Sequence, residues 1–251
     1  MYCSSHFGLI ETPDWSMQAT LESVRSPLQS ATHPLKIVAL GDSLIYGYGD
    51  PVGGGWVERL RRSWMMPGSL GHAVYNLGIR GDGVQQVAAR LENEFRNRGE
   101  LRNRVPDLMI LSVGVNDSAR LGRPDGKNFT DFDTFQTTLE MVLDRATQLC
   151  PVLFVGMVPI DPSKMPFLDC LHYTHADQFR YKEATRMACQ LRQIPYLDVF
   201  ARWQSRGAAW CQAQLLEDGL HPNVNGYQAL LDDVLGWAAL QEQVGAIAHC
   251  A

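Results

Sequence analysis

The sequence has no stretch that approaches about 18 consecutive apolar residues, the length that a membrane-spanning helix requires. Lysine and arginine form no basic run, and 22 basic residues against 27 acidic ones leave a net charge of −5. Because a protein that binds the nucleic-acid backbone needs a basic surface, we expect no nucleic-acid partner. The first residues, MYCSSHFGLI, lack the basic head and long apolar run of a secretory signal peptide. We therefore expect a cytoplasmic protein with no stable membrane insertion.

Cysteine motifs are also missing, although the sequence contains six cysteines, at positions 3, 150, 170, 189, 211 and 250. None of them belongs to a C-x-x-C pair, which excludes a zinc ribbon and a dithiol redox site. Reduced thiols in a cytoplasmic protein are the simplest interpretation.

The chain divides into an N-terminal leader and one domain. Residues 1–34 show no sustained periodicity and contain several prolines, serines and threonines, which predicts an irregular leader. The domain is expected over residues 35–251, with its ordered part ending near Leu240. The whole sequence, with 45% apolar and 20% charged residues, has the composition of a globular protein.

Within the domain, short apolar runs alternate with longer amphipathic ones. The alternation predicts a parallel sheet with helices on both faces. The ligand site of such a fold lies beyond the carboxyl ends of the strands. The predicted strands cover residues 36–40, 73–77, 108–113, 151–158 and 196–199, and the predicted helices cover residues 56–64, 84–98, 135–149, 176–193 and 226–240.

Polar or glycine residues follow the first three predicted strands. Ser43, in Gly-Asp-Ser-Leu after the first strand, can be a nucleophile whose N–H stabilises an oxyanion, or simply a helix N-cap. After the second strand, the glycines at 78, 81 and 83 allow a ligand to approach the backbone, or only form a turn. Asn116, after the third strand, can donate to an oxyanion or close an Asx turn.

An acid and a base stand close together late in the chain, in Asp218-Gly219-Leu220-His221-Pro222. A turn over the glycine can bring the carboxylate to one imidazole nitrogen and leave the other nitrogen facing outward. A surface turn before a proline is the alternative interpretation.

Together these blocks resemble the SGNH hydrolases, also called the GDSL esterase/lipase family. G-D-S-L matches the nucleophile block of that family, N-L-G-I-R-G-D the glycine block, G-V-N-D the asparagine block and D-G-L-H-P the acid/base block. The resemblance covers about residues 36–240 and is closest to the small bacterial lipase/thioesterase branch.

The resemblance implies a flavodoxin-like, three-layer α/β/α fold with a five-stranded parallel sheet of order 2-1-3-4-5. It implies that Ser43 is the nucleophile, His221 the general base and Asp218 its orienting partner. The oxyanion hole would consist of the Ser43 N–H, the Gly81 N–H and the Asn116 side chain, with Gly78 as the competing glycine. It also implies that the protein needs no metal and no organic cofactor.

The expected function is hydrolysis of a carboxylic ester or thioester through an acyl-enzyme on Ser43, as in esterases, lipases and lysophospholipases. The partner would be a small acyl ester or thioester. A carbohydrate O-acetylesterase or an acyltransferase is the alternative within the same chemistry, and a non-catalytic small-ligand binding module is the alternative outside it. The sequence does not indicate an oligomeric state.

Two loops depart from the family pattern, and specificity is expected to reside there. One is the polar segment 122–131, and the other is the segment 159–174. In the second loop, Met165, Phe167 and Leu168 can line an acyl pocket or pack on the domain. His172 and His175 are too poorly accompanied by other ligands to predict a metal site. The glycines at 53–55 lack the ending of a phosphate-binding loop and predict a turn.

Overall fold

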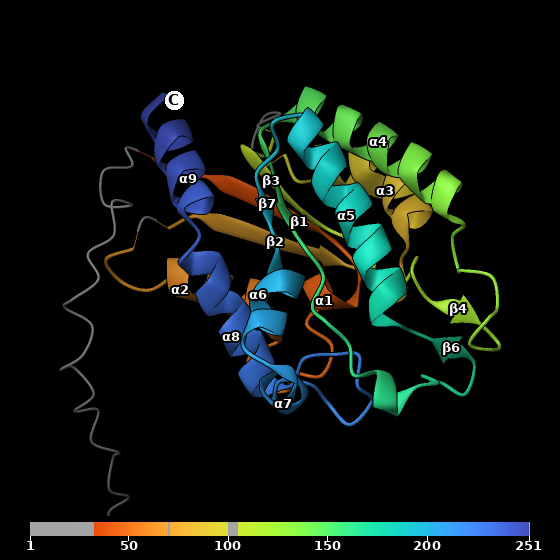
Figure 1. Ribbon diagram of the computed structural model, residues 1–251. Coiled ribbons are helices and arrows are strands. Elements are labelled where there is room, and N and C mark those ends of the chain that lie inside the picture. Colours follow the sequence, from red (N-terminus) through yellow and green to blue (C-terminus); the bar gives the residue numbers. More distant parts are fainter. Residues whose placement is uncertain (1–32, 70, 100–104, 251) are drawn as a thin grey trace, which may run out of the picture.

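Five short apolar runs form a parallel sheet in the middle of the protein (Figure 1). The computed structural model describes residues 33–69, 71–99 and 105–250. The strand order is β2-β1-β3-β5-β7, which is the predicted order 2-1-3-4-5 once only the strands of this sheet are counted. Every residue of β3 and β5 is buried, as expected of a sheet that is covered on both faces. The strands are β1 (Lys36–Gly41), β2 (Ala73–Gly78), β3 (Leu108–Ser112), β5 (Val152–Val155) and β7 (Tyr196–Leu197).

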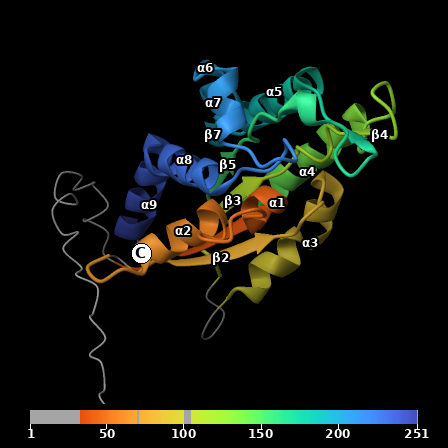
Figure 2. The same cartoon turned by 90° about the horizontal axis from the view of Figure 1, so that it is seen from below.

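Helices cover both faces of this sheet and complete the predicted three layers (Figures 1 and 2). The helices α3 (Val84–Asn97), α4 (Phe132–Leu149) and α5 (His175–Leu191) pack side by side on one face. On the other face α2 (Gly55–Trp64) packs against α8 (Val224–Leu235), and α9 (Ala238–Cys250) follows α8. In the described part of the chain, no helix has the length and apolarity of a membrane-spanning segment.

Shorter elements gather beyond the carboxyl ends of the strands. Helix α1 (Ser43–Tyr46) follows β1 after a single residue and lies beside the ends of β1 and β2 (Figure 1). The two-residue strands β4 (Arg120–Leu121) and β6 (Leu171–His172) pair antiparallel and join the two loops that depart from the family pattern. The remaining short elements are the 3-10 helix η2 (Pro162–Lys164), α6 (Val199–Ser205) and α7 (Ala208–Ala213).

The structure corrects the predicted elements in the C-terminal third. The helix predicted over residues 226–240 is two helices, because Gly236 and Trp237 close α8 with hydrogen bonds to Asp232 O and Val234 O before α9 begins. Helical structure continues to Cys250, past the expected end of the ordered part. Helices α6 and α7 were not predicted, since each is too short to show a helical period. The strand predicted over residues 151–158 is shorter, ending at Val155.

The predicted leader lies outside the described residues except for His33 and Pro34, so its irregular structure stays a prediction. The described domain begins with buried Leu35, whose N–H donates to His72 Nδ1 at 2.9 Å.

Close approach of β1 and β3 requires a glycine at the end of β1. A Cβ on Gly41 would lie 1.9 Å from Ser112 O in the neighbouring strand and 2.7 Å from Ile45 Cγ1 in α1. No real Cβ tolerates the first of these distances, so any side chain here would push the two strand ends apart.

We therefore predict that Gly41→Ala lowers the free energy of unfolding by about 3 kcal/mol, because the added methyl group meets rigid backbone. Urea denaturation would measure the loss. Gly122→Ala is the matched control: its φ is +72° and its Cβ would meet open space, so only the cost of a left-handed alanine, about 1 kcal/mol, is expected. Equal costs for the two variants would contradict the clash at Gly41.

Candidate active site

Ser43 is placed by the sharp passage from β1 into α1. Asp42 caps this helix, because its Oδ1 accepts a hydrogen bond from the Leu44 N–H at 2.9 Å. Ser43 is thus the first residue of α1, where a backbone N–H has no partner within the helix. The side chain is buried, with an exposed fraction of 4%. The predicted location directly after the first strand is therefore correct.

His221 links Ser43 to Asp218. Its Nε2 lies 3.0 Å from Ser43 Oγ, and its Nδ1 lies 2.7 Å from Asp218 Oδ2. A proton on Nδ1 satisfies the carboxylate and leaves Nε2 free to accept from the serine hydroxyl. The structure thus brings together three residues that the sequence separates by up to 178 positions.

The acidic residue is held by its own turn. Asp218 Oδ1 accepts hydrogen bonds from the N–H groups of Leu220 at 2.9 Å and His221 at 3.0 Å, and Gly219 provides the positive φ of +67°. Burial alone would raise the pKa of Asp218, but these bonds and the one from the imidazole hold that pKa below its usual value. Asp218 is therefore ionised at neutral pH and favours a positive charge on His221.

Tyrosine and phenylalanine side chains that the sequence motifs did not reveal hold this site in place. The Tyr48 ring contacts the His221 ring edge-on with centroids 4.6 Å apart, and the Phe167 ring does so at 5.6 Å. The Tyr227 hydroxyl in α8 donates to Tyr48 O at 3.0 Å and lies 3.3 Å from Ser43 O. No motif spacing marks these rings, because they act through packing across separate elements.

Asn116 is oriented by two hydrogen bonds. Its Nδ2 donates to Asp82 O at 2.9 Å, and its Oδ1 accepts from the buried Tyr173 hydroxyl at 3.4 Å. An amide nitrogen has two hydrogens, so one remains for a ligand. Tyr173 is a further residue that the sequence did not indicate.

Gly78 and Gly81 differ in what their N–H groups contact. The Gly78 N–H donates to Asn76 Oδ1 at 3.0 Å, and a Cβ on Gly78 would lie 2.1 Å from Tyr46 N. Gly81 has a φ of +84°, and no group in the described residues accepts a hydrogen bond from its N–H. Gly81, but not Gly78, therefore has a donor available to a ligand.

A cavity of about 330 Å³ opens at these groups. Ser43, Gly81, Asn116 and His221 form its polar end. Its other walls are mainly apolar and come from the two loops that β4 and β6 join; they include Phe129, Phe167, Leu168 and Leu171. Of the three residues considered for an acyl pocket, Phe167 and Leu168 line the cavity, whereas Met165 packs against the hydrophobic core.

Arg90 in α3 joins the backbone segments that carry the polar groups. Its guanidinium donates to Gly41 O at the end of β1 and to Leu77 O in β2, both at 2.8 Å, and pairs with Asp82 at 2.8 Å. Asp82 O is in turn the acceptor for Asn116. A single side chain thus connects the segments of Ser43, Gly81 and Asn116.

Two buried carboxyl groups hold turns at the strand ends. Asp117 accepts from the Val84 N–H at the start of α3, at 3.0 and 3.1 Å, and from the Thr130 hydroxyl at 2.6 Å. Asp42 caps α1 with one oxygen, while its buried Oδ2 has no hydrogen-bond partner in the described residues. Burial, together with the charges of Asp117 and Asp82, raises the pKa of Asp42 from 3.8 to about 7.

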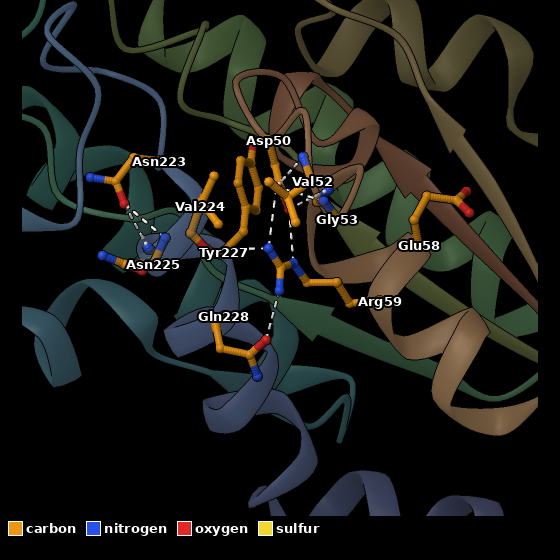
Figure 3. A network of polar contacts seen from close by, with 12 residues as sticks. Asp50, Val52, Gly53, Glu58, Arg59, Asn223, Val224, Asn225, Tyr227 and Gln228 are labelled. Atoms are coloured by element: carbon orange, nitrogen blue, oxygen red, sulfur yellow. Dashed lines mark hydrogen bonds and ion pairs between the residues drawn. The ribbon is translucent and has the colours of Figure 1, made fainter. Parts of the chain in front are cut away.

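The remaining sequence motifs have structural partners. The glycines at 53–55 wrap a carboxylate of the chain itself: Asp50 accepts from the N–H groups of Gly53 and Gly55 and pairs with Arg59, which also binds Gln228 (Figure 3). His175 Nε2 bonds to Ile160 O at 2.8 Å. Within the described residues, no group of three or more His, Cys, Asp or Glu side chains is arranged to hold a metal ion.

Comparison with known proteins finds relatives of this chain. The profile of the GDSL-like Lipase/Acylhydrolase family matches residues 39–229. "Thioesterase 1/protease 1/lysophospholipase L1" of Escherichia coli strain K12 is 26% identical over 208 residues, which cover 82% of this chain and 83% of that protein.

Similar folds occur among solved structures. A lipase/acylhydrolase from Enterococcus faecalis has a TM-score of 0.66 at 21% identity, over 83% of this chain and 96% of that one. The acetylxylan esterase Axe2 from Geobacillus stearothermophilus has a TM-score of 0.63 at 18% identity, over 86% of this chain and 96% of that one.

The buried carboxyl of Asp42 generates a prediction about pH. A pKa raised by folding stabilises the fold below the unfolded value of 3.8, and this stabilisation is lost as the pH rises through about 7. Asn at position 42 keeps the cap but carries no charge. We compare the unfolding free energy of Asp42→Asn with that of the native protein at about pH 5 and at about pH 8. We predict that the advantage of the variant is about 2 kcal/mol larger at pH 8 than at pH 5. Urea denaturation at both pH values would measure this, and a constant difference would contradict it.

Proposed function

The chain belongs to the GDSL-like lipase/acylhydrolase family, and on that premise we propose that it hydrolyses carboxylic esters or thioesters through an acyl-enzyme on Ser43. The observation that carries the proposal is the Ser43–His221–Asp218 chain of hydrogen bonds at 3.0 and 2.7 Å, at one end of an apolar cavity. A nucleophile, its base and an orienting carboxylate at these distances constitute a serine hydrolase triad.

In the first half of the reaction, His221 Nε2 takes the hydroxyl proton as Ser43 Oγ attacks the acyl carbon. The bond to the leaving alcohol or thiol then breaks, and that group takes the proton from His221. In the second half, His221 removes a proton from water, whose oxygen attacks the acyl carbon, and the carboxylic acid leaves as Ser43 regains its proton. Asp218 remains ionised and stabilises the imidazolium in both halves.

We assign the oxyanion hole to the Ser43 N–H, the Gly81 N–H and Asn116 Nδ2. The first two have no acceptor among the described residues, and the third has one hydrogen left after bonding to Asp82. Donors that are already oriented stabilise the developing charge without reorganising during the reaction. Gly78 is not part of this assignment, because its N–H already bonds to Asn76.

The walls of the cavity favour an apolar acyl group. Phe129, Phe167, Leu168 and Leu171 offer no hydrogen bonds for a sugar, and about 330 Å³ lies at the small end of ligand pockets. We therefore propose short or medium acyl chains and prefer them to an acetylated carbohydrate. Hydrolysis rather than acyl transfer is part of the same proposal, as is the cytoplasmic location, which is supported by the four free cysteines of the described residues.

We predict that Ser43→Ala and His221→Ala each lower kcat for p-nitrophenyl butyrate at least about 10³-fold, because neither variant can form or activate the nucleophile. Asp218→Asn should retain more activity than either, since its role is orientation and charge. Fluorophosphonate labelling should be abolished in the serine variant and strongly slowed in the histidine variant, whose serine lacks its base. Ser63→Ala, on the exposed side of α2, is the matched control. A folded Ser43→Ala protein with native turnover would refute the assignment.

The oxyanion assignment predicts the geometry of a phosphonate adduct on Ser43. Its phosphoryl oxygen should lie about 2.7–3.1 Å from Gly81 N and Asn116 Nδ2. Asn116→Ala should lower kcat about 10²- to 10³-fold with little change in KM, because the lost donor acts mainly in the transition state. A crystal structure of the adduct with that oxygen on Gly78 N would contradict the choice of glycine.

A further inference from the structure

Arg80 is the arginine at the cavity, and within the described residues no carboxylate pairs with it. It is exposed and lines the cavity beside Ser43, Gly81 and His221. Most arginines in the described part of the chain form an ion pair, but the contact shown for Arg80 is with a ring: its Cζ lies 3.8 Å from the centroid of Tyr48. The stack covers one face of the guanidinium and leaves its N–H edges open.

The acidic groups around this arginine have other partners. Asp82, two residues away, pairs with Arg90, and Asp218 bonds to His221. In the neighbouring loop Asp50 pairs with Arg59 (Figure 3). In the adjoining helix Glu58 pairs with Arg61. Among the described residues that line the cavity, Arg80 is thus the one lysine or arginine, and its charge remains available to a ligand.

The position of Arg80 favours the leaving group rather than the acyl chain. In the proposed reaction the leaving oxygen or sulfur takes its proton from His221 Nε2. Tyr48 packs against the His221 ring, and Arg80 stacks on Tyr48. One aromatic ring therefore separates the guanidinium from the imidazole that transfers this proton. The apolar walls that suit an acyl chain come from other segments, at Phe129 and Leu168.

There is room for a large leaving group next to Tyr48. A second cavity, of about 600 Å³, is lined by Tyr46, Tyr48, Pro51 and Gly78 among others. Gly78 is two residues before Arg80, and Tyr48 is the ring on which Arg80 stacks. A leaving group that passes Tyr48 would therefore enter this space within reach of the guanidinium.

We propose that Arg80 binds a phosphate group on the leaving alcohol or thiol, so that the enzyme prefers phosphate-bearing acyl esters or thioesters. This inference rests on the proposed hydrolase function. Phosphate is favoured over a carboxylate because Arg80 is exposed and water weakens a pair of single charges. Both groups can accept two hydrogen bonds from one guanidinium, but a phosphate monoester brings a second negative charge to that contact. Tyr48 holds the guanidinium in place before the substrate arrives.

Two matched substrate pairs test the proposal. Octanoylglycerol and octanoylglycerol phosphate differ only in the phosphate of a lipid-type headgroup. S-Octanoyl-N-acetylcysteamine and octanoyl-coenzyme A differ by the phosphate-bearing part of a thioester. For each pair, kcat/KM is measured for the charged and the neutral substrate below the critical micelle concentration. The ratio of the charged to the neutral value is then compared among the native protein, Arg80→Gln and Arg80→Lys.

We expect Arg80→Gln to lower this ratio about 10-fold in at least one pair, the effect of a lost charge-assisted hydrogen bond, with partial retention in Arg80→Lys. The effect should shrink as the salt concentration rises. The pair that responds identifies the source of the phosphate, lipid headgroup or thioester carrier. Arg180→Gln is the matched control, because Arg180 also stacks on a ring, that of Phe132 at 3.8 Å, and it does not line the cavity.

A ratio that changes less than about threefold in both pairs, or that changes equally in Arg180→Gln, would overturn the phosphate subsite while leaving the hydrolase function intact. Binding separates the two questions further. Calorimetry with octanoylglycerol phosphate in the Ser43→Ala background measures the Arg80→Gln effect without any turnover. If native and Ser43→Ala proteins hydrolyse neutral esters equally, the proposed function fails; equal phosphate affinity with and without Arg80 refutes the subsite alone.

Discussion

The geometry of the site depends on the hydrogen bonds and the ion pair that the Arg90 guanidinium forms. Parallel strands bring their carboxyl ends to one edge, where the strand ladder stops and carbonyl groups need other donors. Arg90 donates to Leu77 O and to Gly41 O, which also accepts from the Ile79 N–H at 3.0 Å, and it pairs with Asp82. Gly41 lies just before the segment of the proposed nucleophile Ser43. Leu77 and Asp82 lie on either side of the segment that carries the proposed oxyanion donor Gly81. One α3 side chain thus fixes the spacing between separate loops.

The fold and the polar centre of the site could be predicted because each has a local signal. Apolar runs of strand length mark β1 and β3, and Gly41 and Gly78 mark turns where the backbone approaches another segment too closely for a side chain. Parallel topology then places whatever follows each strand at the same edge. This argument brought Ser43, Asn116 and the Asp218–His221 turn together, although each motif alone also fits an ordinary turn.

The residues that support this centre could not be predicted in the same way. Tyr173 orients Asn116, and Tyr48 and Tyr227 lie around Ser43 and His221, but all three are single aromatic residues in irregular or C-terminal segments. Their roles follow from distances between elements, which sequence spacing does not encode. Met165 shows the same limit: the sequence allowed an apolar residue of this loop either to line a pocket or to pack on the domain, and in the structure Met165 packs against the core and is not among the residues that line the cavity.

In the proposed function, the parts that perform chemistry and the parts that select a substrate come from different segments. The proposed triad and oxyanion donors lie in the segments that follow β1, β2 and β3 and in the Asp218 turn, and are tied by hydrogen bonds with donors and acceptors in fixed directions. The cavity walls come from the β4–β6 loops, where the ring of Phe167 lies against His221. The second loop also reaches the polar centre through hydrogen bonds, from the Asp161 N–H to Gly219 O at 2.7 Å and from the Tyr173 hydroxyl to Asn116. Apolar contacts lack direction, so the apolar wall residues can change in shape without moving these hydrogen bonds. Arg80 is not part of the β4–β6 loops: it follows β2 and contacts His221 through Tyr48. The leaving-group side of the site therefore has its own residue for selecting a substrate.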